Sequence, residues 1–302
     1  MKVRYASERP LQAWRTLSQV RHGPKDPTFR WLSNAEVWRT SLLSSGPVTQ
    51  QILQDGPNAA IVNLWGEGAA EAAETIPTLL GEYDDATGFT PPERVRETAR
   101  RAAGMRMPRT GRVLESLIPA ILEQRVQADA AHLSWRRLVK KFGTPAPGPT
   151  PTGLMVFPSP QVWAAIPSWE WHLADVDAAR ARTAVACARL ATRLETAATL
   201  SSPEAQALLQ KVPGIGPWTS AEVVQNVHGD ADAVSLGDYN LPNVVGWVLA
   251  RERTDEAGML RLLAPYAPHR YRLIRVIRSH EATHESSRRG ARMPLEDHRR
   301  FW

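Results

Sequence analysis

The chain has 302 residues, with 37 Lys and Arg against 31 Asp and Glu, a net charge of +6 and a sequence pI of about 9.8. This length supports a full hydrophobic core, and the basic balance favours a polyanionic partner such as nucleic acid. The single cysteine, Cys187, excludes an internal disulfide and a four-cysteine iron–sulfur cluster. No apolar run approaches the roughly 18 residues of a membrane-spanning helix, and the start of the chain lacks a secretory signal, so we expect a cytoplasmic protein without membrane contact.

Residues 1–92 have the pattern of a small antiparallel sheet with flanking helix. Within them, the segment 1–27 is polar and predicted to be irregular apart from one short helix. Beyond it, alternating or short apolar runs bounded by turn residues predict strands. The expected elements are a short helix at 11–17, strands near 29–31, 48–52 and 59–65, and an Ala-rich helix at 67–80.

Pro91 and Pro92 mark a boundary, and nearly everything after them has helical periodicity. The expected helices are 113–126, 130–142, one opened by Ser159-Pro160, 177–199, one opened by Ser202-Pro203, 243–251, 258–263 and 271–279. We therefore predict an α+β protein with a sheet domain at 1–92, a mostly helical core at 93–285 and a basic tail at 286–302.

The chain is organised around one stretch, LLQKVPGIGPWTS at 208–220. Its VPGIG segment predicts a tight turn between two helices, with Pro217 at the first position of the second helix. Gly214 and Gly216 can adopt positive φ and let a ligand approach the backbone, and exposed amides at a helix N-terminus bind anions. The short motif alone also fits an ordinary helical hairpin with a buried Trp.

Trp218 follows this turn, and a carboxylate, Asp238, comes further along the chain in LGDY. The full string resembles the helix-hairpin-helix (HhH-GPD) DNA glycosylase superfamily, within it the bacterial 3-methyladenine DNA glycosylase II branch. The resemblance covers most of residues 28–280 and is strongest at 203–245, with the hairpin at 204–228. It implies a sheet domain followed by a helical glycosylase core. It also implies a monomer that acts on damaged bases in double-stranded DNA of the bacterial nucleoid and requires no cofactor.

Asp238 matches the catalytic Asp of that superfamily. A carboxylate near C1′ stabilises the positive charge that develops on the sugar as the base leaves, or orients a water molecule. The same residue also fits a helix cap. Trp218 stands where lyase members carry a Lys nucleophile, so the resemblance implies a monofunctional enzyme that leaves an abasic site.

Alkylated purines carry a positive charge, and an aromatic wall would favour them through stacking and cation–π attraction. Trp218 and Tyr239 are the candidates for that wall, although each also fits simple packing. Family members often carry an aromatic residue one helical turn after the Trp, where this chain has Glu222. That departure leaves the substrate range open beyond the 3-methyladenine and 7-methylguanine type.

The resemblance also implies contacts to the DNA backbone. Amides of Gly214 and Gly216, with the Thr219 hydroxyl, would hold a phosphate. Gln124-Arg125-Val126 matches the family's Gln-Leu-Val-like segment, which places Arg125 as the side chain that fills the gap left by the flipped base, or as a plain surface residue. Family members also bind a monovalent cation on hairpin carbonyls, which here are those of Gln210, Val212 and Ile215.

Two other classes of protein remain open. His280-Glu281-Ala282-Thr283-His284 spells H-E-x-x-H, the pattern of a zinc peptidase, although little of the sequence follows it to supply a third ligand. A helix-hairpin-helix protein that binds DNA without catalysis is the other alternative. The arginines of the tail, which we expect to be a solvated segment, are Arg288, Arg289, Arg292, Arg299 and Arg300.

Overall fold

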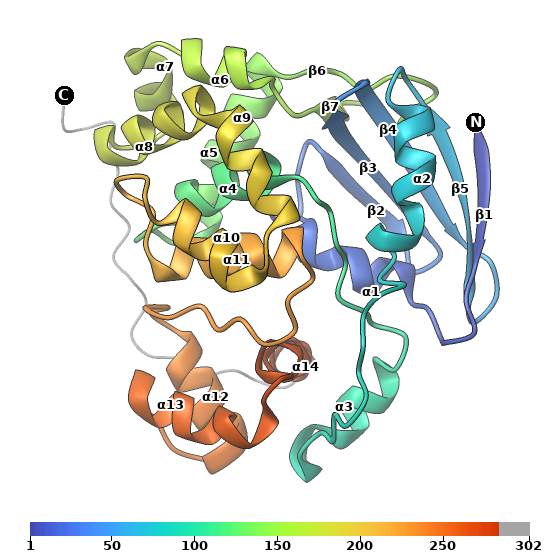
Figure 1. Cartoon of the computed structure of the whole chain (residues 1–302), viewed down its shortest axis with the longest axis vertical. Coiled ribbons are helices and arrows are strands. Elements are labelled where there is room, and N and C mark those ends of the chain that lie inside the picture. The colour runs from blue at the N-terminus through green and yellow to red at the C-terminus, as the bar shows by residue number, and fades with distance from the viewer. Residues whose placement is uncertain (284–302) are drawn as a thin grey trace.

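The computed structural model describes residues 1–283 and places a five-stranded antiparallel sheet beside a helical core (Figure 1). The strand order is β1-β5-β4-β3-β2. The strands are β1 (Lys2–Ala6), β2 (Phe29–Ser33), β3 (Glu36–Leu43), β4 (Gly46–Gln54) and β5 (Ala59–Trp65). The predicted α+β class, with an N-terminal sheet before the helices, is confirmed.

Two of these strands were not predicted. The segment 1–27 is not irregular, because β1 pairs with β5 along its whole length. Its charged residues Lys2 and Arg4 hide the strand pattern, and pairing with a strand far along the chain supplies the stability that local sequence does not show. The strand β3 pairs with β4 from Glu36 to Leu43 and is buried through most of its length, so it lacks a clear alternation.

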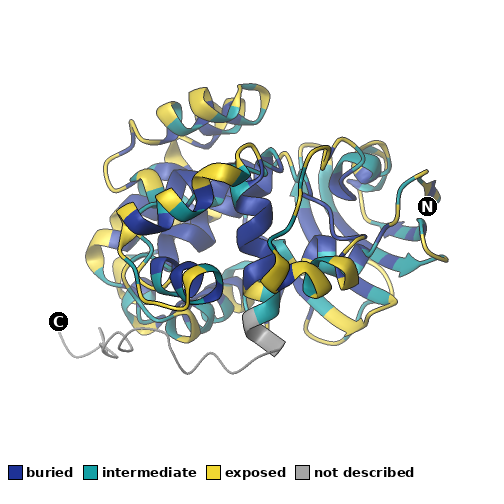
Figure 2. Cartoon of the chain, turned by 90° about the horizontal axis from the view of Figure 1, so that it is seen from below, coloured by how far each residue is buried: buried dark blue, intermediate teal, exposed yellow. Residues whose placement is uncertain are grey.

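One face of the sheet is covered by α1 (Ala13–Leu17) and α2 (Ala69–Leu79), both near their predicted positions. Apolar side chains from the sheet meet those helices in a continuous cluster. Its largest fully buried members are Leu17, Ile52, Leu64, Ile76 and Leu80. Figure 2 shows buried residues along the inside of both the sheet and the helical core, with exposed residues on the outer helices and loops.

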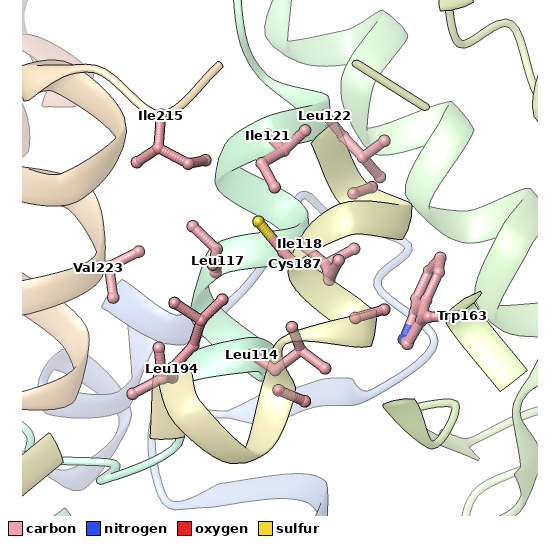
Figure 3. Packing of buried hydrophobic residues seen from close by; sticks show 14 of the residues in the cluster. Leu114, Leu117, Ile118, Ile121, Leu122, Trp163, Cys187, Leu194, Ile215 and Val223 are labelled. Carbon is pink, nitrogen blue, oxygen red and sulfur yellow. The ribbon is translucent and has the colours of Figure 1, made fainter. Parts of the chain in front are cut away.

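The helical core is built around α4 (Val113–Leu122), in which every residue except Glu115 is buried. Figure 3 shows its leucines and isoleucines packed against Trp163, Cys187 and Leu194. Burial raises the pKa of the Cys187 thiol to about 12, so this thiol is a packing group. The helices around it are α5 (Ala128–Phe142), α6 (Pro160–Ala165), α7 (Ser168–Leu173), α8 (Ala178–Arg189), α9 (Ala191–Glu195), α10 (Ser202–Leu209) and α11 (Pro217–Val227).

Two helix predictions need correction. The helix predicted at 113–126 stops at Leu122, and the segment 123–126 forms a turn. The long helix predicted at 177–199 is broken at Leu190, where the backbone leaves helical geometry (φ −95°, ψ 9°) between α8 and α9. A continuous run of helix-forming residues at this point carries no signal for the break.

A third apolar cluster combines residues in and around α3 (Arg96–Arg101) with the last three helices. These are α12 (Leu241–Ala250), α13 (Glu256–Leu263) and α14 (Arg270–Thr283). The two short strands β6 (Thr144–Pro145) and β7 (Met155–Val156) form a separate pair. None of the helices within residues 1–283 is long and apolar enough to cross a membrane.

The helix α14 connects the sheet domain to the rest of the molecule. Arg272 makes a buried ion pair with Asp84, in which both side chains are 4% exposed. One turn later, Arg275 donates hydrogen bonds to the carbonyl oxygens of Arg106 (2.8 Å) and Arg15 (2.7 Å). Figure 1 shows α14 seen end-on between α12, α3 and the segment that leaves the sheet.

Candidate active site

The predicted hairpin consists of α10, a turn at residues 210–216 and α11. The helix α10 starts with a capping box, in which Ser201 and Glu204 satisfy each other's backbone amides. In the turn, the Ile215 N–H donates to the Val212 carbonyl at 3.0 Å. Pro217 then begins α11 as expected, because its fixed φ suits a first helical position.

The two hairpin glycines have different reasons to be glycine. Gly214 has φ +91°, and a Cβ there would collide with the side chain of Thr183. Gly216 does not have the positive φ predicted for it, since its backbone is extended (φ −104°, ψ −176°). A Cβ at Gly216 would meet no atom within 4 Å in the described chain. The fold therefore requires Gly214, whereas Gly216 leaves space on the surface of the hairpin.

Gln124 ties the turn after α4 to the hairpin. Its side-chain amide donates to the Gly214 carbonyl (2.9 Å) and to the Thr219 hydroxyl (2.8 Å). Thr219 is only 2% exposed, so its hydroxyl does not reach the surface as the predicted phosphate contact requires. The structure corrects that prediction: Thr219 and Gln124 position the two loops relative to each other.

Arg125 follows Gln124 directly and is exposed, with a left-handed backbone (φ 55°). Such a conformation is uncommon for a residue with a side chain and costs free energy unless the surroundings impose it. Two residues that precede it are held in place. Gln124 is fixed to the hairpin, and buried Arg180 donates to the Leu122 carbonyl at the end of α4 (2.7 Å). Arg125 is thus held outward at the rim beside the hairpin.

Asp238 lies in the loop between α11 and α12, and its two carboxylate oxygens have different partners. Oδ1 accepts from the backbone amides of Asn240 and Leu241, both at 2.8 Å, and so caps the start of α12. Oδ2 accepts from the Trp218 indole N–H at 3.4 Å and lies 3.7 Å from the Arg278 guanidinium. The side chain is 19% exposed. The structure therefore brings Asp238 and Trp218 together and gives Asp238 a capping role as well.

The other predicted pocket residues lie nearby, although they differ in exposure. Tyr239 is 52% exposed, next to Asp238. Glu222 is one helical turn after Trp218 on α11, and it is partly buried. The Ser235 hydroxyl donates to Glu222 Oε1 at 2.5 Å, and the Gln225 side-chain amide donates to that hydroxyl at 2.9 Å.

Burial raises the pKa of Glu222, and the nearby carboxylates of Glu123 and Asp238 act in the same direction. Arg278 and the Ser235 hydrogen bond oppose this shift without cancelling it. The two carboxyl groups therefore have different environments: Glu222 is desolvated, whereas Asp238 accepts two backbone hydrogen bonds and faces an arginine.

Glu123 and two histidines contribute further titratable groups. Glu123 Oε1 lies 3.7 Å from His22 Nδ1 and 3.7 Å from His132 Nε2. Burial lowers the pKa of the His132 imidazole. At His22 burial acts in the same direction, but the carboxylates of Glu123 and Asp26 outweigh it and raise the pKa. Within residues 1–283, no group of three or more His, Cys, Asp or Glu side chains is placed to hold a metal ion.

Sequence reasoning missed several of these groups. His22, Glu123, Ser235 and Arg278 come from four distant parts of the chain, and only the fold brings them near Glu222. A signal existed for one of them, because α14 carries Arg at 272, 275 and 278, a spacing that places three charges along one helix face. Such a row on a buried helix indicates acceptors elsewhere, which here are carboxylates for Arg272 and Arg278 and backbone carbonyls for Arg275.

The H-E-x-x-H motif at the end of α14 gains no support. His280 Nδ1 lies 3.0 Å from the Thr98 hydroxyl, so this imidazole interacts with α3. His284 and the arginines of the tail lie outside the described residues. A small cavity between the sheet and the helical core is also separate from Asp238: it is lined by His22, Glu115 and the buried Arg39, among others.

The chain has the fold of solved DNA glycosylases. It resembles the 3-methyladenine DNA glycosylase of Archaeoglobus fulgidus with a TM-score of 0.73 at 17% identity, over 91% of this chain and 97% of that one. It also resembles the 8-oxoguanine glycosylase/lyase of Clostridium acetobutylicum in complex with double-stranded DNA, with a TM-score of 0.68 at 10% identity, over 93% and 98% of the two chains. The predicted resemblance to helix-hairpin-helix DNA glycosylases is therefore confirmed in the fold.

Sequence comparison gives a shorter match. A probable bifunctional transcriptional activator/DNA repair enzyme AlkA of Mycobacterium tuberculosis is 35% identical over 149 residues, in each of two strains. The match covers 49% of this chain but only 29% of the length of those relatives. None of the protein-family models compared with the sequence matches it.

Proposed function

We propose that this protein is a DNA glycosylase of base excision repair that hydrolyses the bond between a damaged purine and its deoxyribose in duplex DNA. The observation that carries the proposal is the position of Asp238. Its Oδ2 lies against Trp218 at the start of α11, directly beside the hairpin turn. The glycosylase fold and the partial identity to a DNA repair enzyme support the same reading.

Asp238 would act on the sugar. As the base departs with the electron pair of the glycosidic bond, positive charge develops at C1′ and the ring oxygen. An ionised carboxylate oxygen fixed nearby stabilises that charge, and it can accept a proton from the water that adds to C1′. Oδ1 is occupied by the amides of α12, so Oδ2 is the oxygen available for this role.

Trp218 makes the proposed enzyme monofunctional. A lyase needs an amine nucleophile at this position of the hairpin, and an indole cannot form a Schiff base with the sugar. The product would be an intact strand with an abasic site. Borohydride added during turnover should therefore trap no covalent protein–DNA adduct, and a trapped adduct would overturn this part of the proposal.

The hairpin would hold the DNA backbone next to the flipped nucleotide. The space in front of Gly216 lets a phosphate reach the amides at the start of α11, whose dipole favours negative charge. Arg125, held outward beside the hairpin, would fill the gap in the base stack.

A monovalent cation on the carbonyls of Gln210, Val212 and Ile215 is part of this proposal. These three residues belong to the turn between α10 and α11. The Val212 carbonyl accepts one hydrogen bond, from Ile215, and retains a second lone pair, so the oxygen donors suit a hard cation. When bound, the cation would supply positive charge for a phosphate oxygen.

We propose cationic alkylated purines, of the 3-methyladenine and 7-methylguanine type, as substrates. They are good leaving groups, and Trp218 with the exposed ring of Tyr239 offers aromatic faces for a positively charged base. The protein would work as a monomer on chromosomal DNA of the bacterial nucleoid, in keeping with its net charge of +6.

The test is incubation with DNA treated with a methylating agent, followed by chromatography of the free bases released. We expect 3-methyladenine and 7-methylguanine in solution and abasic sites in intact strands. If the protein binds this DNA but releases no base from it, then it is a helix-hairpin-helix binding protein without glycosylase activity.

A further inference from the structure

We propose that Glu222 is a second catalytic residue, which donates a proton to a ring nitrogen of an uncharged purine as that base leaves. The inference rests on the proposed glycosylase function and assigns a further residue to that reaction. Glu222 would act on purines without a fixed positive charge, such as deaminated adenine.

The first argument is position. Glu222 and Trp218 are one helical turn apart on α11, so their side chains lie on one helix face with Cβ atoms about 5–6 Å apart. The Trp218 indole contacts Asp238 Oδ2, the oxygen proposed to face the sugar. Glu222 therefore follows on the same face of α11 as the indole that contacts Asp238, and the charges of Asp238 and Arg278 act on its carboxyl group.

The second argument is the hydrogen-bond chain that orients the carboxyl group. Gln225 donates its amide N–H to Ser235, so the hydroxyl oxygen of Ser235 is used as an acceptor. The single proton of that hydroxyl is then directed to Glu222 Oε1 at 2.5 Å. Because Oε1 accepts this bond, Oε2 is the oxygen left to carry a proton and present it to a ligand.

The third argument is the electrostatic surroundings. The titratable and charged groups that face Glu222 are Glu123, His22, Asp238, Tyr271 and Arg278. Burial and the two carboxylates favour the protonated form of Glu222. Arg278 favours the ionised form, but this arginine is shared with Asp238, from whose Oδ2 it lies 3.7 Å away. A desolvated carboxyl group near a carboxylate that accepts two backbone hydrogen bonds and faces an arginine is an arrangement that can supply an acid and a charge stabiliser together.

The chemistry explains why an uncharged purine needs this residue. An N7- or N3-alkylated purine already carries the positive charge that makes it leave readily, whereas an uncharged purine would depart as an anion. In the proposed step the bond between C1′ and N9 breaks and its electron pair stays on the purine, while the proton of Glu222 Oε2 moves to a purine ring nitrogen. Water adds to C1′ and gives a proton to Asp238. Solvent then reprotonates Glu222 and takes the proton from Asp238, so the net reaction is hydrolysis.

The experiment compares two duplex substrates, one with a single 7-methylguanine and one with a single deoxyinosine. Single-turnover rates of base release are measured for the wild-type protein, Glu222→Gln and a matched control, Glu74→Gln. Gln keeps the size of Glu222 and can accept the Ser235 hydrogen bond, but it cannot transfer a proton. Glu74 is exposed on α2, so its change removes one negative charge far from the site.

We expect Glu222→Gln to lose deoxyinosine cleavage by at least about 100-fold, the usual weight of a positioned acid. Its rate on 7-methylguanine should fall far less than its rate on deoxyinosine, whereas Glu74→Gln should match the wild type on both substrates. With wild-type protein, deoxyinosine cleavage should fall as pH rises through the raised pKa of Glu222, because the proton-bearing form is lost. Cleavage of 7-methylguanine should show no such fall.

Folding of the variant can be judged independently. Because Glu222 has a higher pKa folded than unfolded, the folded state binds its proton more tightly, and stability falls as pH rises between those two pKa values. Glu222→Gln removes this loss, so at neutral pH its melting temperature should equal or exceed that of the wild type.

The outcomes separate the two proposals. Release of neither base by wild-type protein would overturn the glycosylase function itself. Release of 7-methylguanine without deoxyinosine, or equal loss of both activities in Glu222→Gln, would overturn the acid role of Glu222 and leave the glycosylase proposal standing.

Discussion

At the scale of single residues, Asp238 joins a capping contact to its proposed catalytic role, and a substitution can separate the two. Its Oδ1 caps α12, and its Oδ2 faces Trp218 and Arg278. Asp238→Asn keeps an oxygen for the cap but removes the negative charge, so base release from methylated DNA should fall by at least about 100-fold. The melting temperature and the affinity for DNA should change little, which calorimetry and a binding titration would measure.

Asp238→Ala is the matched comparison for this prediction. It removes the cap as well as the charge, so it should also lower the free energy of unfolding by about 1 kcal/mol. Full base release by Asp238→Asn would show that the carboxylate serves α12 alone.

A substitution at Arg125 can likewise test base release without a loss of stability. Its left-handed backbone is imposed by the contacts of Gln124 and the end of α4, and glycine adopts the same φ at no steric cost. Arg125→Gly should therefore keep or raise the free energy of unfolding, by about 1 kcal/mol at most. If Arg125 occupies the gap in the base stack, base release from duplex DNA should drop, while release from a single-stranded substrate should be affected less. If Arg125→Gly releases bases from duplex DNA as fast as the wild type, Arg125 is a surface residue that does not fill the gap.

Residues within one short motif were predictable, and residues gathered by the fold were not. Trp218 and Asp238 are 20 residues apart in the one stretch that the sequence singled out, and the fold joins them by a hydrogen bond. Glu222 was recognisable as a departure, but its raised pKa depends on burial and on the charges of Glu123 and Asp238, which sequence spacing does not relate to it. Thr219 was misjudged because its burial is set by packing against Gln124 and α4.

At the scale of secondary-structure elements, the hairpin predicts different consequences for its two glycines. Gly216→Ala fits an extended backbone and open space, so it should leave the melting temperature nearly unchanged and weaken DNA binding. Gly214→Ala must adopt positive φ against Thr183, so it should lower stability by more than about 1 kcal/mol. Thermal unfolding and a DNA titration on both variants would test this. A strong loss of stability in Gly216→Ala would contradict the interpretation of its open face as a binding surface.

Elements with a local signal were predicted better than elements that depend on distant partners. Capping at Ser159 and Pro at the start of α11 located two helix starts closely. The strand β1 was not predicted because its edge position tolerates charged residues and its partner β5 is far along the chain. The break between α8 and α9 was not predicted because both helices share one run of helix-forming residues.

At the scale of the whole molecule, the ion pair between Asp84 and Arg272 connects the sheet domain to α14. Both side chains are almost fully buried, so Asp84→Asn would leave an unpaired buried guanidinium. We expect a loss of about 3–5 kcal/mol in the free energy of unfolding. The control is Asp55→Asn, which breaks the exposed pair with Arg4 and should cost less than about 1 kcal/mol. Denaturant titrations would compare the two, and similar small losses would mean that the buried pair does not hold the domains together.

The same ion pair has a consequence for how the protein is made. Asp84 and Arg272 are 188 residues apart, and a ribosome adding about 5–20 residues per second needs roughly 10–40 s to synthesise the chain between them. During that interval the nascent sheet domain carries the Asp84 carboxylate without the Arg272 guanidinium that later pairs with it. Completion of the first domain therefore depends on α14, so ribosome-bound chains that stop before this helix should remain sensitive to proteases.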